Sequence, residues 1–532
     1  MCIRDSSRAS ASRAAVTQSP VSASASPSSG STQLSTELGD ALALTGDCVT
    51  AARLADALLG SADPAQRAAG VRIAASVSMH DGSAAAAADL FRWLGPYPDA
   101  FIGSAAAVVS VATGDVATAR AALDVEDTGP PTSTARAARS LAEGLLYTVD
   151  RPFPAAIGRL SQAITAEWSS TRVAPDSPAA LVTLVALHGG DPVRARSIIG
   201  RAAGADAGQG EVFSAHRHRL LLGWTRMLDG QLNRAAADAA AADSATLHRR
   251  DALWAAALRT AIARRAGDTG AMQQHWYAAI EVLAEYSIDL FALLPLGELW
   301  VAAARLRLVD RLQHHLDDAL GLLDTLGKPP LWSVPLHWSG VHAGILANSP
   351  DAVAPHGQAL TAAAADSTYA RALATAGRAW LRVLANQVDV DDVTLAARAL
   401  AQFGLTWDAT RLASQAALQT PDPRVSGVML QLARDLKSST PDAPEGPEIP
   451  DDAVRSAGAP ARPPAPSSRL SDREREVAEL LLLGMPYRDI GSQLFISAKT
   501  VEHHVARIRR RLGAESRSEM LSMLRALLGT PA

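Results

Sequence analysis

The chain of 532 residues is long enough for roughly two to four domains with sizeable hydrophobic cores. Its net charge of −4 excludes a protein that coats nucleic acid uniformly with basic side chains. Two cysteines, Cys2 and Cys48, are too few for a disulfide framework, no apolar run reaches the roughly eighteen residues of a membrane span, and the opening lacks the apolar core of a signal peptide. We therefore expect a cytoplasmic protein in a reducing compartment.

Two regions of different composition make up most of the chain. Residues 1–34 consist largely of Ser, Ala, Pro and Gly. Because this composition buries little apolar surface, we expect a disordered arm. Residues 35–436 are rich in Ala, Leu and Arg and show no β-type alternation. We predict an all-α protein in which one helix follows another through this whole range.

A recurring acidic turn, often Gly-Asp or Asp-Gly, divides the helical range into units. Examples are GDCVTAARLADAL at Gly46, GDVATARAALDV at Gly114 and GDPVRARSIIGRA at Gly190. The markers, 34 to 42 residues apart, are Asp47, Asp81, Asp115, Asp150, Asp191, Asp229, Asp268, Asp310, Asp351 and Asp389. This period is typical of tetratricopeptide-like helical hairpins stacked in a solenoid, where an Asp in the turn caps the following helix. A chance series is the alternative, because Asp is common in turns.

The helical range carries no recognisable catalytic or metal-binding motif. All ten tryptophans lie in it, and we interpret them mainly as packing residues between hairpins, with a ligand cage as the alternative. No G-x-S-x-G elbow occurs, and none of the three lysines lies in a P-loop. The pairs His216/His218 and His314/His315 lack Cys or carboxylate partners at metal-ligand spacing. We expect no enzymatic activity, no cofactor and no metal.

Basic residues are concentrated at the C-terminus. Residues 437–468 are rich in Pro, Ser, Asp and Ala and are expected to form a flexible linker. From Arg469 to the end, eleven Arg and Lys face eight Asp and Glu, which gives +3 and leaves −7 for the rest of the chain. Such a distribution favours a DNA-binding domain attached to an acidic body.

Residues 469–532 are predicted to contain four short helices. Ser471 and Glu474 form a capping box that opens the first helix, and Gly484 ends it. Pro486 suits the first turn of the second helix, where its missing N–H is no loss.

The third and fourth helices are also predicted to begin at capping residues. Ser497 caps the third helix and Gly513 ends it; its apolar positions are Val501, Val505, Ile508 and Leu512. A second capping box, Ser516 to Glu519, opens the fourth helix, whose apolar side carries Leu521, Leu524 and Leu528.

The third helix has an unusual polar face. Its members are Lys499, Thr500, Glu502, His503, His504, Arg507, Arg509, Arg510 and Arg511. A short helix, a tight turn and a basic amphipathic helix together suit the major groove of DNA, which admits one α-helix. The alternative is an ordinary solvated helix rich in arginine.

The same stretch resembles the LuxR/GerE-type helix-turn-helix family. The matching motifs are L-S-x-R-E-x-E-V at Leu470–Val477, D-I-G-x-x-L-F-I-S-x-K-T-V-E-x-H-V at Asp489–Val505, and R-L-G-A-x-S-R at Arg511–Arg517. The resemblance implies a transcription regulator that binds double-stranded DNA, usually as a homodimer on inverted half-sites.

The resemblance also assigns roles by position. Base reading falls on Glu502, His503 and Ala506, and phosphate contacts fall on or near Lys499, Thr500 and His504, with Arg507 and Arg510 adding salt-dependent affinity. The last helix, with Leu521, Leu524 and Leu528, is implied to supply much of the dimer contact. Many members have Lys where this chain has Glu502, and Ala506 is too short to bond a base. Glu502 therefore either accepts from cytosine N4 or pairs with a nearby Arg.

The end of the helical range carries a second resemblance. ALAQFGLTWDATRLASQAAL at Ala399–Leu418 is similar to the closing repeat of MalT-like activators, in which an ATPase module precedes a helical-repeat sensor and a DNA-binding domain. Here no ATPase module is recognised. The sequence does not decide whether the first residues are natural, or whether an N-terminal module is missing.

The combined prediction is an all-α regulator with four parts. A disordered arm (1–34), a tetratricopeptide-like solenoid (35–436), a linker (437–468) and a four-helix LuxR-type domain (469–532) follow one another. The solenoid is expected to sense a small molecule or protein through its concave surface. Two alternatives stay open: an interaction scaffold whose last domain only dimerises, and a fragment of a larger ATP-dependent activator. Effector, target sequence and the choice between activation and repression are not encoded in any motif.

Overall fold

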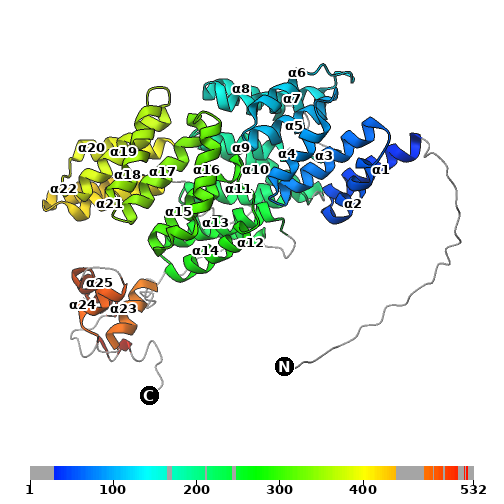
Figure 1. The fold of residues 1–532 in the computed structure, drawn as a ribbon. Helices are drawn as coiled ribbons and strands as arrows, with labels where there is room; N and C mark the ends of the chain where they lie inside the picture. Colours follow the sequence, from blue (N-terminus) through cyan, green and yellow to red (C-terminus); the bar gives the residue numbers. More distant parts are fainter. Residues whose placement is uncertain are drawn as a thin grey trace, which may run out of the picture. The chain divides into compact units, whose positions relative to one another are not determined.

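The computed structural model of the chain describes residues 29–164, 171–209, 212–242, 247–438, 472–482, 485–494, 498–512, 520–521 and 523–524. These residues form 25 α-helices and two short 3-10 helices, with no β-strand among them. The predicted all-α class is confirmed. The chain divides into two units, one before and one after the bond between Pro444 and Glu445. The first contains α1 to α22 and the second contains α23 to α25 (Figure 1).

The first unit is a series of helical hairpins, in which each odd-numbered helix packs against the even-numbered helix that follows it. The first hairpins are α1 (Ser29–Leu44) with α2 (Cys48–Leu59), α3 (Pro64–His80) with α4 (Ala84–Leu94), α5 (Ala100–Ala112) with α6 (Val116–Asp124), and α7 (Ser133–Asp150) with α8 (Phe153–Ile164). The next are α9 (Pro178–His188) with α10 (Pro192–Gln209), α11 (Ala215–Leu228) with α12 (Leu232–Ala241), and α13 (Arg249–Ala266) with α14 (Thr269–Leu283).

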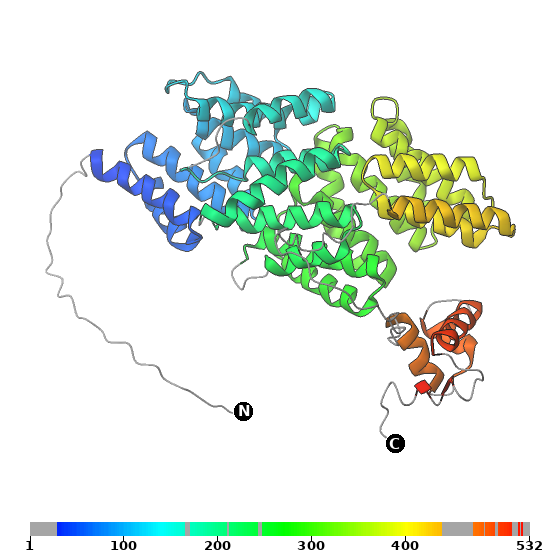
Figure 2. The same cartoon turned by 180° about the vertical axis from the view of Figure 1, so that it is seen from behind.

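The remaining hairpins complete the solenoid. Short 3-10 helices, η1 (Leu290–Ala292) and η2 (Val309–Arg311), flank α15 (Leu293–Leu306). The further helices are α16 (Gln313–Thr325), α17 (Pro330–Leu346), α18 (Pro350–Ala363), α19 (Thr368–Leu384), α20 (Val390–Gln402), α21 (Thr406–Gln419) and α22 (Pro423–Ser438). Figures 1 and 2 show the hairpins following one another from α1 (blue) to α22 (yellow). The predicted helical-hairpin solenoid is confirmed.

Turn chemistry explains the acidic markers of the sequence. A residue in the left-handed region ends the first helix of most hairpins, as Gly114 (φ +89°) does after α5 and Asn386 (φ +58°) does after α19. Glycine adopts this conformation without strain, and Asn tolerates it better than most residues. An Asp then caps the next helix by accepting the N–H three residues on, at Asp47, Asp115, Asp191, Asp268 and Asp389. Asp81, Asp229 and Asp310 also lie between the two helices of a hairpin, whereas Asp150 is the last residue of α7 and Asp351 lies in the first turn of α18. The predicted hairpin period is confirmed, and the predicted capping role is confirmed at five of the ten markers.

Two predicted boundaries need correction. Helix α1 begins at Ser29, so residues 29–34 are helical rather than part of a disordered arm. The sequence of residues 29–34 consists mainly of small polar residues and therefore gave no helix signal. In the structure, Gln33 Nε2 donates to Glu37 Oε1 across one helical turn. Helix α22 continues to Ser438, two residues into the expected linker. Residues 1–28 and 439–471 lie outside the described part of the chain, so the arm and the linker stay predictions.

Odd-numbered helices lie on the inner side of the solenoid. Each packs against the next odd-numbered helix, whereas among successive even-numbered helices of the described residues only α20 and α22, at the far end, make a substantial contact. Helix α3 also meets α13, and α17 meets both α7 and α9. Trp332 Nε1 of α17 donates to Thr148 Oγ1 of α7 at 2.9 Å. One continuous core extends from α3 to the start of α17, so side chains fill the inner side that we expected to be an open sensing surface.

The connector between α8 and α9, residues 171–177, is held by arginines of the inner helices. Arg72 of α3 donates to the Val173 carbonyl at 2.7 Å, and Arg217 of α11 donates to Asp176 at 3.0 Å. Burial raises the pKa of Asp176, but its two arginine neighbours outweigh burial and lower the pKa overall. The ion pairs therefore keep a charged connector stable inside the unit, and loss of either partner would leave a buried charge unpaired.

The second unit is a small three-helix core that α23 (Asp472–Leu482), α24 (Tyr487–Leu494) and α25 (Ala498–Leu512) build together. These helices begin and end beside the predicted cap and stop residues, of which Ser471, Gly484, Ser497 and Gly513 lie outside the described residues. Of the fourth predicted helix, the structure describes helical backbone at 520–521 and 523–524.

The hairpin turns offer a matched stability test. Gly190 (φ +73°) lies in the α9–α10 turn, and a Cβ there would come within 2.8 Å of both Tyr369 and Phe403. Gly230 (φ +85°) has the same backbone conformation with no heavy atom within 4 Å of that Cβ. We expect Gly230→Ala to destabilise the protein by about 1 kcal/mol, and Gly190→Ala by at least about 1 kcal/mol more because of overcrowding. Thermal melting of both variants checks this, and equal losses would contradict the close packing of Gly190.

Candidate nucleic-acid interface and effector surfaces

One side of α25 is buried in the core of the second unit. Val501 and Ile508 are 0 % exposed and Val505 is 7 % exposed, and they pack with Val477 of α23 and Ile490 of α24. This burial confirms the predicted apolar stripe at the positions whose side chains are described. Because the stripe faces inward, the orientation of the remaining faces of the helix is fixed.

The opposite side of α25 is polar and open to solvent. Lys499, Glu502 and His503 are exposed, and Thr500 and His504 are half-buried. The backbone of α25 includes the other predicted contact residues, Ala506, Arg507 and Arg510, but their side chains lie outside the described residues. Spacings of three and four residues place Lys499, Glu502, His503 and Ala506 on one face.

Arg509 extends this face and was not among the predicted contact residues. It is exposed, and it follows Ala506 by three residues and Glu502 by seven. Helical periodicity alone would have found it, because those spacings return to the same side of the helix.

Pro486 directly precedes the first residue of α24, Tyr487. Its carbonyl accepts the N–H groups of Asp489 at 2.9 Å and Ile490 at 3.0 Å, so it starts the helix as the sequence predicted. Helix α24 then packs against α25, and α23 packs against both. A short helix that crosses a longer, polar-faced helix after a tight connection is the arrangement of a helix-turn-helix DNA-binding domain.

The predicted dimer residues fall in different environments. Leu524 is 0 % exposed and belongs to the domain core, Leu521 is half-buried, and Leu528 lies outside the described residues. The assignment of Leu524 to a dimer surface needs correction, because its side chain already packs within its own domain. Met523 is 37 % exposed and lies off the spacing of the leucine stripe.

Comparison with known proteins agrees with this geometry. Residues 468–524 match the bacterial regulatory proteins of the luxR family. The chain is 46 % identical over 50 residues to the spore germination protein GerE of Bacillus subtilis (strain 168), an alignment that covers 9 % of this chain and 68 % of that protein. The chain belongs to the luxR family through this domain. Membership in this family indicates a DNA-binding transcription regulator.

The solenoid resembles solved helical-repeat structures only weakly. The tetratricopeptide domain of P58(IPK) is 11 % identical, with a TM-score of 0.19 over 78 % of this chain and 100 % of that one. The Cut9–Hcn1 hetero-tetramer of the APC/C gives 12 % identity and a TM-score of 0.20 over 76 % of this chain and 99 % of the compared chain. Scores of this size carry no inference, and the hairpin fold follows from the helix contacts themselves.

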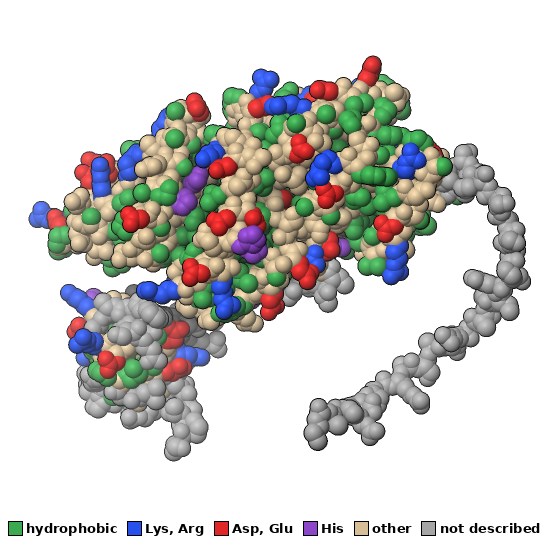
Figure 3. All heavy atoms as spheres, viewed as in Figure 1, with side chains coloured by type: hydrophobic (Ala, Val, Ile, Leu, Met, Phe, Trp, Pro, Cys, Tyr) green, Lys and Arg blue, Asp and Glu red, His purple; other side chains and the backbone are tan. Residues whose placement is uncertain are grey.

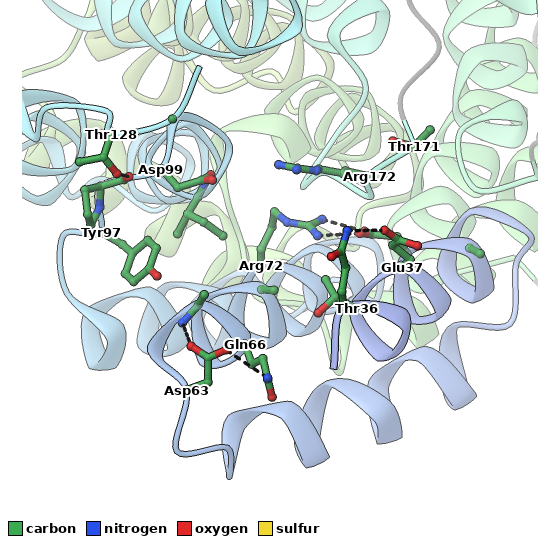
Figure 4. Close-up of a pocket in the computed structure, with 18 of the residues that line it drawn as sticks. Thr36, Glu37, Asp63, Gln66, Arg72, Tyr97, Asp99, Thr128, Thr171 and Arg172 are labelled. Atoms are coloured by element: carbon green, nitrogen blue, oxygen red, sulfur yellow. Dashed lines mark hydrogen bonds and ion pairs between the residues drawn. The ribbon is translucent and has the colours of Figure 1, made fainter. Parts of the chain in front are cut away.

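A polar cavity of about 1280 Å³ lies near the start of the solenoid. Figure 4 shows Glu37 of α1 across from Tyr97 and Asp99, with Arg72 of α3 between them. Arg72 is already engaged, because both of its terminal nitrogens donate to Asp40 at 2.8 Å. The cavity therefore offers mainly carboxylate and hydroxyl oxygens, and it is one candidate surface for an effector.

A buried Ser–His–Asp chain joins α9, α10 and α11. Ser177 Oγ lies 2.5 Å from His218 Nε2, and His218 Nδ1 lies 2.8 Å from Asp206 Oδ2. The connectivity is that of a hydrolase triad, but the Ser177 hydroxyl also caps α9 by accepting the Ala180 N–H. The Ser177 N–H, which a hydrolase would need for an oxyanion, donates to Asp176. We interpret these contacts as a structural link between the three helices.

The surface of the solenoid shows no single electrostatic patch on the face in view. Figure 3 shows acidic and basic side chains scattered over this face. In the described part of the chain, no helix is long and apolar enough to cross a membrane, and no three His, Cys, Asp or Glu side chains form a group that could hold a metal ion.

Proposed function

We propose that this protein is a sequence-specific transcription regulator that binds double-stranded DNA as a homodimer through α25, under the control of an effector bound by the solenoid. The observation that carries the proposal is the two-sided character of α25. Its apolar stripe is buried, while Lys499, Glu502, His503 and Arg509 face solvent. A helix presented in this way enters the major groove with its polar face toward the bases.

Each part of this face has a distinct task. Lys499, with the arginines of α25, neutralises phosphates and so provides affinity that depends on salt but not on sequence. Glu502 and His503 lie one turn further along and reach base edges, where a carboxylate accepts a hydrogen bond from cytosine N4. Met523 and Leu521 replace Leu524 as the proposed dimer contact.

The interaction-scaffold alternative makes a different prediction about DNA. In that case the second unit would dimerise without binding duplex DNA. A gel-shift titration of the full chain with genomic fragments at two salt concentrations separates the two functions. Binding that weakens steeply with salt supports the regulator, and an absence of binding at low salt would refute it.

Lys499→Ala is expected to weaken binding to every duplex and to reduce the slope of log K against log salt by about 1, because one phosphate contact is lost. Arg475→Ala is the matched control, since Arg475 is also exposed but lies on α23. Titrations at several salt concentrations measure both variants. An unchanged slope for the Lys499 variant would place that side chain away from the phosphates.

Glu502→Lys is expected to change the preferred half-site, because the carboxylate accepts from cytosine whereas an ammonium group favours guanine O6 and N7. Selection of binding sites from random duplexes reads out the preference. Glu476→Lys introduces the same change of charge on the exposed surface of α23 and controls for simple electrostatics. If both variants select the wild-type sequence, Glu502 does not read a base.

Met523→Asp is expected to prevent dimer formation, because a carboxylate would be buried without a partner in an apolar contact. Sedimentation of the complexes with an inverted repeat and with a single half-site gives the stoichiometry. The variant should bind the inverted repeat as one copy where the unchanged protein binds as two. A two-copy complex of the variant would show that the contact lies elsewhere.

A further inference from the structure

A cluster of arginines and tryptophans joins helices that are far apart in sequence. Arg264 and Arg265, in the last turn of α13, both donate to Glu298 of α15 at distances from 2.6 to 3.0 Å. Their guanidinium carbons lie 5.1 and 5.3 Å from the ring centre of Trp407 on α21. The face of one indole therefore meets two cations that share a single carboxylate.

Arg411 is the unpaired member of this cluster. Its guanidinium carbon lies 5.3 Å from the ring centre of Trp407 and 5.5 Å from that of Trp380 on α19. Arg411 is half-buried, and the described residues give it neither a hydrogen bond nor an ion pair. Both rings therefore lie within cation–π distance of the guanidinium. None of its N–H groups donates to another described residue, and such groups bind a planar anion.

Further polar atoms near Arg411 are unpartnered. Trp380 is 4 % exposed and His342 of α17 is 7 % exposed, and the buried Nε1 of Trp380 and Nε2 of His342 have no hydrogen-bond partner among the described residues. Burial lowers the pKa of His342 to about 4, so its imidazole is neutral at physiological pH. A buried polar atom without a partner is costly, and the Trp380 ring that carries one of these atoms lies 5.5 Å from the guanidinium carbon of Arg411.

The charge balance of the cluster is positive. The carboxylates named as acting on Arg264, Arg265 and Arg411 are those of Glu298 and Asp408, so two carboxylates face these three guanidinium groups. Asp408 lies in the first turn of α21, where the helix N-terminus already stabilises its charge. Burial lowers the pKa of Arg411, the other two arginines and Arg305 lower it further, and Asp408 alone among the named charges opposes them. A negatively charged group at the edge of Arg411 would relieve this repulsion.

We propose that Arg411, within cation–π distance of Trp380 and Trp407, is the core of a binding site for a small anion that carries a carboxylate or phosphate group. Trp380 is buried, whereas Trp407 and Arg411 are half-buried, so a small charged group would reach Arg411 from the side of Trp407. The anion is the effector of the solenoid. That role, though not the binding itself, rests on the proposed function.

Binding is tested on the full chain by thermal melting. Inorganic phosphate and citrate are titrated separately against sodium chloride at matched ionic strength, so that one arm tests phosphate and the other carboxylate. Saturable stabilisation by either anion supports the site, and the arm that responds identifies the chemistry. No stabilisation beyond that of sodium chloride by either anion would overturn it.

Arg411→Gln removes the cation and is expected to weaken anion binding roughly tenfold or more, as loss of a charge-assisted hydrogen bond does. Arg398→Gln on the exposed side of α20 removes the same charge nearby and should leave the affinity unchanged. Equal affinities in these two variants would overturn the assignment. If circular dichroism shows that Arg411→Gln does not fold, Arg411→Lys replaces it, with weaker binding expected because the planar fork is lost.

The effector role has a separate readout. DNA affinity is measured by gel shift with and without the stabilising anion at constant ionic strength, for the unchanged protein and for Arg411→Gln. An anion effect on DNA affinity that disappears in the variant supports the role. Anion binding without any effect on DNA affinity overturns the role and leaves the site standing. Failure to bind DNA under all conditions would refute the proposed function without affecting the melting result.

Discussion

Burial of one apolar stripe determines what α25 can present to a partner. Val501, Val505 and Ile508 pack against α23 and α24, and the helix cannot rotate without moving a charged residue into that core. A shift by a single position would replace Val501 with Glu502, which no neighbour in the core could neutralise. The orientation of the polar side of α25 is therefore set by the hydrophobic core rather than by the charges on that side. In the proposed function, those charges set DNA affinity and base preference on a surface whose orientation the core has fixed.

The solenoid obeys a related constraint, because each helix must bury one face against its hairpin partner and another against the next hairpin. Left-handed residues such as Gly114 reverse the chain within a few residues, and the Asp caps begin the second helix at once. Short turns of this kind keep the odd-numbered helices on one side of the unit. On that side α3 contacts α13, and α7 and α9 contact α17. Under the proposed function, an effector would therefore bind this unit at an open cavity or at a gap between hairpins.

Local chemistry made most of the fold predictable, and distant contacts made the rest unpredictable. Aspartate caps, turn glycines and apolar spacing act within a few residues, so they located the hairpins and the faces of α25. Leu524 is buried by helices that lie earlier in the chain, and the spacing of the leucines alone does not distinguish a core position from a dimer surface. The contacts of Arg264 with Glu298 and with Trp407 join residues from three hairpins. No spacing rule connects such positions.

Because the cationic cluster joins helices that are far apart in sequence, its stability depends on how the hairpins between them are arranged. Trp407 and Arg264 touch only when α21 and α13 are brought together by the curvature of the hairpins between them. Repulsion among the arginines opposes that curvature, while an anion at Arg411 would remove part of the repulsion. An anion would thus bind more tightly to the more closed form, and by linkage it would increase the population of that form. An effector must bind one conformation of the protein more tightly than another. An uncompensated charge between two distant helices would provide this difference in affinity.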